Sequence, residues 1–332
     1  MTGVVARAAG LTLDESPIER TAIDTLRALA IDAAQASRSA TPDAMAPLVY
    51  VLWQRFVRFD PDDPGWPNRD RFLLCADGAP ALLAALLHLA GVKANGPQHD
   101  RELAVTLGDL ERFGERAAQG TPFEPLPGEN LLRGRAHERL AASTAVALAA
   151  RERAERFDRP GFAMFDSDVY VLCGDGCLDD DAASKAALRA AELGLSNLCW
   201  IYDDTRPASA AGDPDRRGAE VAERMRACGW NAVRVDDGAD TAALSAALES
   251  FRSEGDRPTL VVVGGEASAP SSGHERLRVP PGVREHFRDG AGRRGRALRN
   301  AWFVRLAAYR ELHPELAEEI DHMTHLAIPG IS

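Results

Sequence analysis

Apolar residues along this chain follow two different spacings. Over several long segments they recur every three or four residues, which is the period of one face of an α-helix. In the segment 21–37, for example, Ile23, Leu26, Ala30 and Ala33 share one face. The helices that this spacing predicts cover 21–37, 45–59, Ala79–Ala90, 140–157, 182–192, 218–228 and 241–254.

Short, continuously apolar runs separate the helices of the second half. These runs, with one earlier candidate, predict strands at 71–75, Val169–Cys173, 198–202, Asn231–Val235 and Thr259–Val263. Such alternation is typical of an α/β, doubly wound, mostly parallel sheet with helices on both faces. We expect a flexible N-terminus over 1–17, one domain over 18–283, and a helical C-terminal tail over 284–332 that packs on it or links from it. The Gly- and Pro-rich segment 114–134 is expected to be a long loop.

Charge and cysteine content exclude several classes of protein. The 332 residues carry 39 basic and 50 acidic side chains, a net charge of −11, unlike a nucleic-acid-binding protein with a basic face. The apolar runs are too short to cross a bilayer, and the N-terminus lacks the pattern of a signal peptide. The five cysteines are scattered and predict reduced, mostly buried thiols. These features indicate a cytoplasmic protein that binds neither nucleic acid nor membrane.

A candidate binding turn follows the strand Val169–Cys173. Gly174, Asp175 and Gly176 stand at its carboxyl end, where doubly wound sheets bind their ligands. Glycine allows the backbone to approach a phosphate closely, and a carboxylate suits a divalent ion that bridges two phosphates. The plainer alternative is a tight turn between a strand and a helix.

The next predicted strand also ends in polar residues. Asp203, Asp204 and Thr205 follow it, about one strand–helix unit after Asp175. Because neighbouring parallel strands end at the same edge of a sheet, the two strand ends can converge on one ion. A solvated turn at Asp203 and Asp204 is the alternative.

At this point the chain resembles the transketolase family. The segment 169–178 is similar to the thiamine-diphosphate motif of transketolases, and 154–162 is a very close match to another family block. Further similar segments lie at 51–53, 64–66, 69–72, 86–89, 193–198, 202–204, 307–309 and 313–316. The resemblance is ordered and extends along most of the chain.

The resemblance implies a thiamine-diphosphate-binding fold of the diphosphate-binding (PP) type, with thiamine diphosphate and Mg²⁺ or Ca²⁺ as cofactors. The cofactor-binding residues that it implies are Gly174, Asp175, Gly176, Cys177, Asp180 and Thr205. The metal ligands are Asp175, Thr205 and the backbone carbonyl of Pro207. Thr205 stands where the family has an asparagine, and Asp180 where it has a glutamate of an inter-subunit acidic network.

A whole transketolase is about twice as long as this chain and has a second, pyrimidine-binding domain. The resemblance therefore implies one subunit of a split enzyme, which needs a separate pyrimidine-domain partner in a hetero-oligomer expected to be α2β2. A small-molecule substrate would bind between the subunits.

Several family histidines are replaced. Thr41 and Gly78 stand where the family has histidines, and the region 115–121 has none. The glycine-rich cofactor loop of the family corresponds to 134–139, in which Arg139 takes the place of the last glycine. Since histidines of that site orient sugar hydroxyls and move protons, ordinary sugar-phosphate transfer is not expected.

The remaining histidines and the charged loop allow two interpretations each. His274 corresponds to a family histidine, and His137 is either a relocated acid–base group or a solvated loop residue. His88, on an apolar helix, is expected to be packed in the core. Arg133, Arg135 and Arg139 form either an anion site or a solvated charged loop.

Two functions remain open. One is an enzyme subunit that transfers a two-carbon ketol or acyl unit to a non-standard acceptor, with His274 and His137 as catalytic candidates. The other is a non-catalytic relative, a structural or regulatory partner that kept the fold and lost the sugar site. The intact Gly174–Gly176 turn favours the first, whereas Thr205, Thr41 and Gly78 favour the second.

Overall fold

A computed structural model describes residues 16–37, 43–76, 79–94, 102–113, 135–205, 216–265 and 278–326. Its strands are β1 (Arg71–Leu74), β2 (Val169–Cys173), β3 (Leu198–Asp203), β4 (Asn231–Val235) and β5 (Thr259–Val263). Its main helices are α1 (Pro17–Ser37), α2 (Ala46–Val51), α3 (Ala79–Ala90), α6 (Ala136–Phe157), α8 (Asp181–Glu192), α9 (Arg216–Ala227) and α10 (Thr241–Ser253). Shorter helices are α4 (Leu107–Glu111) and α7 (Asp175–Leu178). The C-terminal part forms α11 (Val283–Phe287), a π-helical turn (Arg288–Gly292), α12 (Arg293–Leu312) and α13 (Pro314–Leu326).

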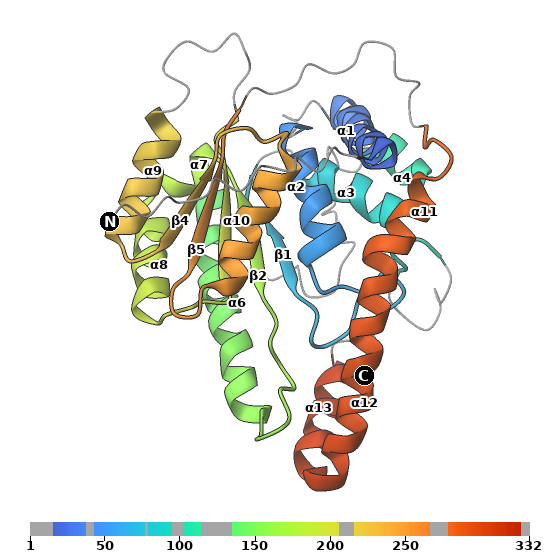
Figure 1. The fold of residues 1–332 in the computed structure, drawn as a ribbon, viewed down its shortest axis with the longest axis vertical. Helices are drawn as coiled ribbons and strands as arrows, with labels where there is room; N and C mark the ends of the chain where they lie inside the picture. The colour runs from blue at the N-terminus through green and yellow to red at the C-terminus, as the bar shows by residue number, and fades with distance from the viewer. Residues whose placement is uncertain are drawn as a thin grey trace, which may run out of the picture.

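The five strands form one parallel sheet in the order β1-β2-β3-β5-β4. Figure 1 shows this sheet at the centre of the domain, with helices packed on both sides. The chain passes from β3 to β4 at one edge and returns to β5 inside the sheet, with α9 and α10 as crossover helices. The predicted doubly wound α/β fold is confirmed.

The two faces of the sheet belong to two separate apolar cores, because side chains alternate along each strand. Tyr170 and Leu172 of β2 point into a core shared with α1, α2, α3 and α10. Val169 and Val171 point into the opposite core, shared with α6, α8 and α9. Central strands that are buried on both faces need continuous apolar runs, which explains their pattern in the sequence.

A third core joins the C-terminal helices to the rest of the chain. Trp302 and Tyr309 of α12 pack with Phe157 at the end of α6 and with Phe165 in the following segment. Their polar atoms are satisfied as well, because the Trp302 indole donates to the Met164 carbonyl at 2.6 Å and the Tyr309 hydroxyl donates to the Phe157 carbonyl at 2.7 Å. The predicted helical tail is therefore folded against the described part of the domain.

One local expectation differs from the structure. The helix predicted over 45–59 is α2 followed by a π-helical turn, Leu52–Phe56, and the chain is extended from Val57 onward. Arg294 explains this early end, because its guanidinium donates to the carbonyls of Trp53, Phe56 and Val57 at 2.7–3.2 Å. These are carbonyls that a helix end leaves without partners inside the helix.

The five cysteines are free thiols, and Cys75, Cys173, Cys177 and Cys199 are buried, as the sequence predicts. His88 is also packed as expected. It is 1% exposed, and its Nδ1 lies 2.9 Å from the Val105 carbonyl. Burial lowers the pKa of His88. None of the helices in the described ranges is long and apolar enough to cross a membrane.

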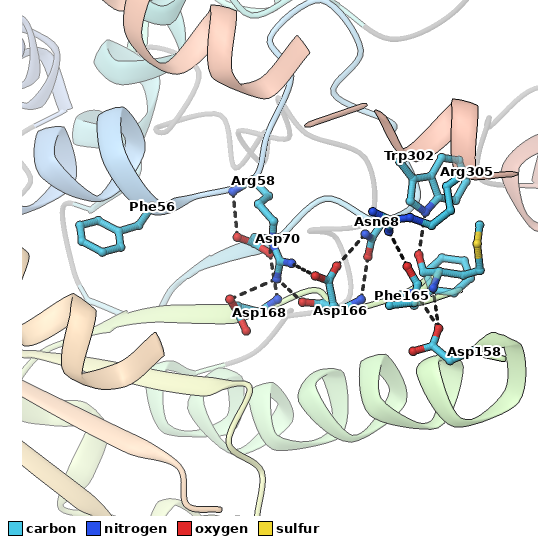
Figure 2. A network of polar contacts seen from close by, with 12 residues as sticks. Phe56, Arg58, Asn68, Asp70, Asp158, Phe165, Asp166, Asp168, Trp302 and Arg305 are labelled. Carbon is cyan, nitrogen blue, oxygen red and sulfur yellow. Dashed lines mark hydrogen bonds and ion pairs between the residues drawn. The ribbon is translucent and has the colours of Figure 1, made fainter. Parts of the chain in front are cut away.

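A charge network centred on the buried pair Arg58 and Asp70 holds the amino-terminal edge of the sheet together (Figure 2). Arg58 donates from Nε to Asp70 at 2.9 Å and forms ion pairs with Asp166 at 2.5 Å and Asp168 at 3.1 Å. Asp70 also accepts from the backbone amides of Arg58 and Asp168 at 2.8 and 2.9 Å. Since Arg58 and Asp70 precede β1 and Asp168 precedes β2, this network sets how the two strands enter the sheet.

The network contains one carboxyl group that titrates near neutral pH. Burial, reinforced by the neighbouring charge of Asp70 and opposed by Arg58, raises the pKa of Asp168 to about 7. Between pH about 4 and 7 the folded chain therefore binds more protons at this site than the unfolded chain does. The contribution of Asp168 to stability consequently falls as the pH rises through that window.

We expect Asp168→Asn to raise the melting temperature relative to the unmodified protein by more at pH 8 than at pH 5.5. The reason is that only the carboxylate carries the cost of burial. Thermal unfolding followed by circular dichroism at both pH values measures this difference. Asp181→Asn is the control, because the pKa of exposed Asp181 is lowered by Lys185 and its titration lies below this window. If Asp168→Asn changes the melting temperature equally at pH 5.5 and pH 8, Asp168 is ionised at both pH values.

Candidate functional site

The carboxyl-terminal ends of β1, β2 and β3 lie side by side. Leu74 is paired with Leu172, and Cys173 is paired with Tyr202, so Gly174 follows β2 at the level where Asp203 ends β3. The backbone amide of Cys75 continues the ladder by donating to the Leu172 carbonyl at 2.8 Å. The polar ends of β2 and β3 are therefore neighbours, as the sequence predicts.

The segment 174–178 is one turn of helix rather than a tight turn. Gly174 is extended, with φ −128° and ψ −169°, and α7 begins at Asp175. The Cys177 amide donates back to the Gly174 carbonyl at 3.0 Å, and the Gly174 amide donates to Cys177 Sγ at 3.4 Å. A Cβ atom at Gly176 would meet nothing within 4 Å, so space is open beside this turn.

The carbonyl of Cys75 connects three elements at this edge. It accepts from Cys177 Sγ at 3.3 Å and from Arg139 Nη2, on the first turns of α6, at 3.4 Å. Burial and the nearby Cys177 thiol raise the pKa of Cys75 to about 12, against the opposing charge of Arg139. The Cys75 thiol is therefore a neutral packing group rather than a nucleophile.

The end of β3 is organised by Asp203. Its Oδ1 accepts from the Thr205 backbone amide at 3.0 Å and from the Thr205 hydroxyl at 2.5 Å. Asp204 is 4% exposed and lies against α9, where a Cβ at Gly218 would overlap its carboxylate. A solvated turn is therefore the wrong interpretation for Asp204.

His137 and Asp180 are brought together although 43 residues separate them in the sequence. His137 Nε2 lies 3.8 Å from Asp180 Oδ2, and the imidazole is 16% exposed. Asp180 also caps α8 by accepting from the Ala182 amide at 2.8 Å. His137 is thus partly buried beside a carboxylate, and the solvated-loop interpretation does not describe it.

Other predicted residues lie outside the described ranges: His274, Pro207, Thr41, Gly78, Arg133 and the loop 114–134. Of Asp175 the structure describes the backbone position at the start of α7. Within the described part of the chain, no group of three or more His, Cys, Asp or Glu side chains has the arrangement of a metal centre. The metal assignment of Asp175, Thr205 and Pro207 therefore stays a prediction.

A cleft of about 250 Å³ lies at the opposite, amino-terminal edge of the sheet, lined by the Arg58 network together with Ser196, Asn197, Phe251, Arg252 and Glu254. Parallel doubly wound sheets bind ligands at their carboxyl edge, so this cleft is on the wrong side for that role. We therefore take the carboxyl edge around α7 as the functional site. The sequence left open whether Arg139 belongs to an anion site or to a solvated loop, and it gave no signal of its contact with the Cys75 carbonyl at this edge.

Comparisons with known proteins point to one family. Residues 18–275 match the family model described as transketolase, thiamine diphosphate binding domain. Transketolases of Geobacillus stearothermophilus and Bacillus subtilis are 33% and 32% identical, and each match covers 94% of this chain and 50% of the relative. The crystal structure of a Pichia stipitis transketolase in complex with sedoheptulose-7-phosphate superimposes with a TM-score of 0.76 at 27% identity, over 93% of this chain and 49% of that one.

The chain thus spans about half the length of the curated relatives that it matches. That half contains the parallel sheet and the turn at the end of β2, and the family model covers both. The chain belongs to the transketolase family, as its thiamine diphosphate-binding domain.

Proposed function

We propose that this chain is the diphosphate-binding subunit of a split, transketolase-like enzyme of the cytoplasm. In this proposal it transfers a two-carbon ketol or acyl unit to a non-standard acceptor, in specialised metabolism. The observation that carries the proposal is the retained turn at Gly174–Gly176, next to the polar end of β3, in a chain that spans half of its relatives. When bound, thiamine diphosphate supplies stabilisation of the carbanion formed at the cleaved carbon–carbon bond.

The described residues leave room for a diphosphate, and Thr205 offers one oxygen to a metal. Space is open beside Gly176, and the site lies at the ligand-binding edge of the sheet. The Thr205 hydroxyl donates a hydrogen bond to Asp203. The lone pairs of the Thr205 oxygen therefore stay available to a hard cation. We assign Asp175, Thr205 and the Pro207 carbonyl to Mg²⁺ or Ca²⁺.

The remaining residues of the turn take supporting roles in the proposal. Gly174 and Cys177 hold the turn through their mutual hydrogen bonds, and Gly176 leaves room for the phosphates. Asp180 lies beside the site and orients His137. Protons are moved in this proposal by His274, which corresponds to a family histidine, and by His137 as a relocated acid–base group, since the family histidines at positions 41 and 78 are replaced.

The chain needs a second polypeptide in this proposal. Its relatives are about twice as long, so a partner with the pyrimidine-binding domain would complete the active site in an α2β2 assembly. The family has histidines at two positions where this chain has Thr41 and Gly78. Their loss favours an acceptor other than an ordinary sugar phosphate.

The second candidate function is a non-catalytic partner or regulatory subunit. It is favoured by Thr205, which stands where the family has an asparagine, and by the charged residues that replace the glycine-rich loop at 134–139. A chain that binds the cofactor with its partner, but turns over no ketol donor, would have this second function.

Titration calorimetry of the full chain with thiamine diphosphate and Mg²⁺, with and without a pyrimidine-domain partner, tests the proposal. We expect saturable binding that is tighter with the partner. Asp175→Ala should abolish it, because the metal would lose its only carboxylate among the assigned ligands. Asp179→Ala is the matched control, since Asp179 follows α7 and pairs with Arg217 at 3.5 Å. Absence of binding in both conditions would sink the enzyme subunit, and equal affinity of Asp175→Ala would show that the metal lies elsewhere.

A further inference from the structure

Two arginines at the start of α6 have different surroundings. The Arg135 side chain is 77% exposed and pairs with Glu138 at 3.3 Å. Arg139, one turn later, is half-buried and points to the sheet, where Nη2 donates to the Cys75 carbonyl at 3.4 Å. Its Nε is buried and makes no hydrogen bond in the described structure. The solvated-loop alternative therefore describes Arg135, and the anion-site alternative is left for Arg139.

A short series of contacts links the Arg139 guanidinium to the turn at the end of β2. The Cys75 carbonyl that accepts from Arg139 also accepts from Cys177 Sγ at 3.3 Å. Cys177 Sγ in turn accepts from the Gly174 amide at 3.4 Å. The Arg139 guanidinium and the Cys177 thiol of α7 therefore donate to the same carbonyl, that of Cys75.

The hydrogen bonding of this guanidinium is incomplete. It makes one long bond to a neutral carbonyl, and no ion pair to a carboxylate is found for it among the described residues. A buried N–H without a partner costs free energy, and an arginine fork matches two oxygens of a phosphate. An anion at the turn would supply the missing countercharge.

We propose that Arg139 binds the diphosphate of the cofactor, as a cationic side chain in place of the glycine that the family has at this position. This inference rests on the proposed function, because it assumes that a diphosphate occupies the turn. It makes Arg139 a positioning residue for the cofactor, and it gives the altered loop at 134–139 a binding role rather than a blocking one.

Calorimetric titration of the full chain with inorganic pyrophosphate and Mg²⁺ tests the role of Arg139 without the rest of the cofactor. We expect Arg139→Gln to raise the dissociation constant about 10-fold or more, the usual effect of losing a charge-assisted hydrogen bond. Arg139→Lys should recover part of the affinity, because it keeps the charge without the fork. Arg135→Ala, which removes the same charge from the same helix, should change the constant less than 2-fold.

The outcomes separate this inference from the proposed function. If the unmodified chain binds Mg²⁺-pyrophosphate and Arg139→Gln binds it equally well or more tightly, the inference is overturned and the proposed function stands. If the unmodified chain binds neither pyrophosphate nor thiamine diphosphate, both fall. Far-UV circular dichroism checks that each variant is folded. Should Arg139→Gln not fold, Arg139→Lys decides, since unchanged affinity and unchanged salt dependence would contradict a guanidinium–phosphate contact.

Discussion

Replacement of Arg58 by methionine is expected to destabilise the protein by about 3–5 kcal/mol. Arg58 is the cation of a network with three carboxylates, and the Asp70 side chain in that network is fully buried. Burial alone lowers the pKa of Arg58, but the carboxylates raise it above its ordinary value, so the guanidinium stays charged. Methionine fills a similar volume but leaves the charge of Asp70 buried without its ion pair to Arg58.

Urea unfolding followed by circular dichroism measures this loss as a shift of the midpoint at constant slope. Arg293→Met is the matched control. Arg293 also meets a carboxylate at 2.9 Å, that of Asp289, but both side chains are more than 60% exposed, so about 1 kcal/mol or less is expected. Adding Asp70→Asn to the Arg58 variant should recover part of the loss, because it removes the buried charge. A loss as small as that of the control would mean that water reaches the network.

Substitution of Gly295 by alanine is expected to cost about 3 kcal/mol or more, although alanine normally stabilises a helix relative to glycine by about 1 kcal/mol. Gly295 lies on the buried side of α12. There the helix crosses Phe59, which follows the π-helical turn Leu52–Phe56. A Cβ there would lie 2.6 Å from the carbonyl carbon of Phe59 and closer still to its oxygen. Because backbone atoms cannot rotate away, α12 would have to move as a whole.

Gly108→Ala is the matched control for this prediction, because Gly108 is helical and its Cβ would make only ordinary contacts, with the flexible Arg112 side chain at 3.5 Å and the Thr106 hydroxyl at 3.7 Å. We expect that control to be neutral or slightly stabilising. Thermal unfolding of both variants gives the comparison. If Gly295→Ala melts at the temperature of the unmodified protein, α12 must be free to shift away from Phe59, and its close approach there is not required for folding.

The neighbouring polar ends of β2 and β3 could be predicted from the sequence, but the side-chain contacts around them could not. Gly174–Gly176 and Thr205 follow apolar strands directly, and parallel pairing then places their ends together. The distance of 3.8 Å between His137 and Asp180 depends instead on how the first turn of α6 packs against α7 and the residues that follow it. The contact of Arg139 with the Cys75 carbonyl has the same origin. A local pattern carries no information on such distances.

The sequence by itself determined the order and kind of the strands and helices, the parallel sheet, and the turn after β2. Each of these follows from short-range spacing: apolar runs that are buried on both faces, helical periods, and glycines at a strand end. The surroundings of individual charged side chains were decided only by the tertiary structure. Arg135 and Arg139 lie four residues apart in the same loop-to-helix segment, yet one is solvated and the other donates to the Cys75 carbonyl at the end of β1. The physical reason is that burial and hydrogen-bond partners come from segments far apart in the chain, here β1 and α7, which meet only when the sheet forms.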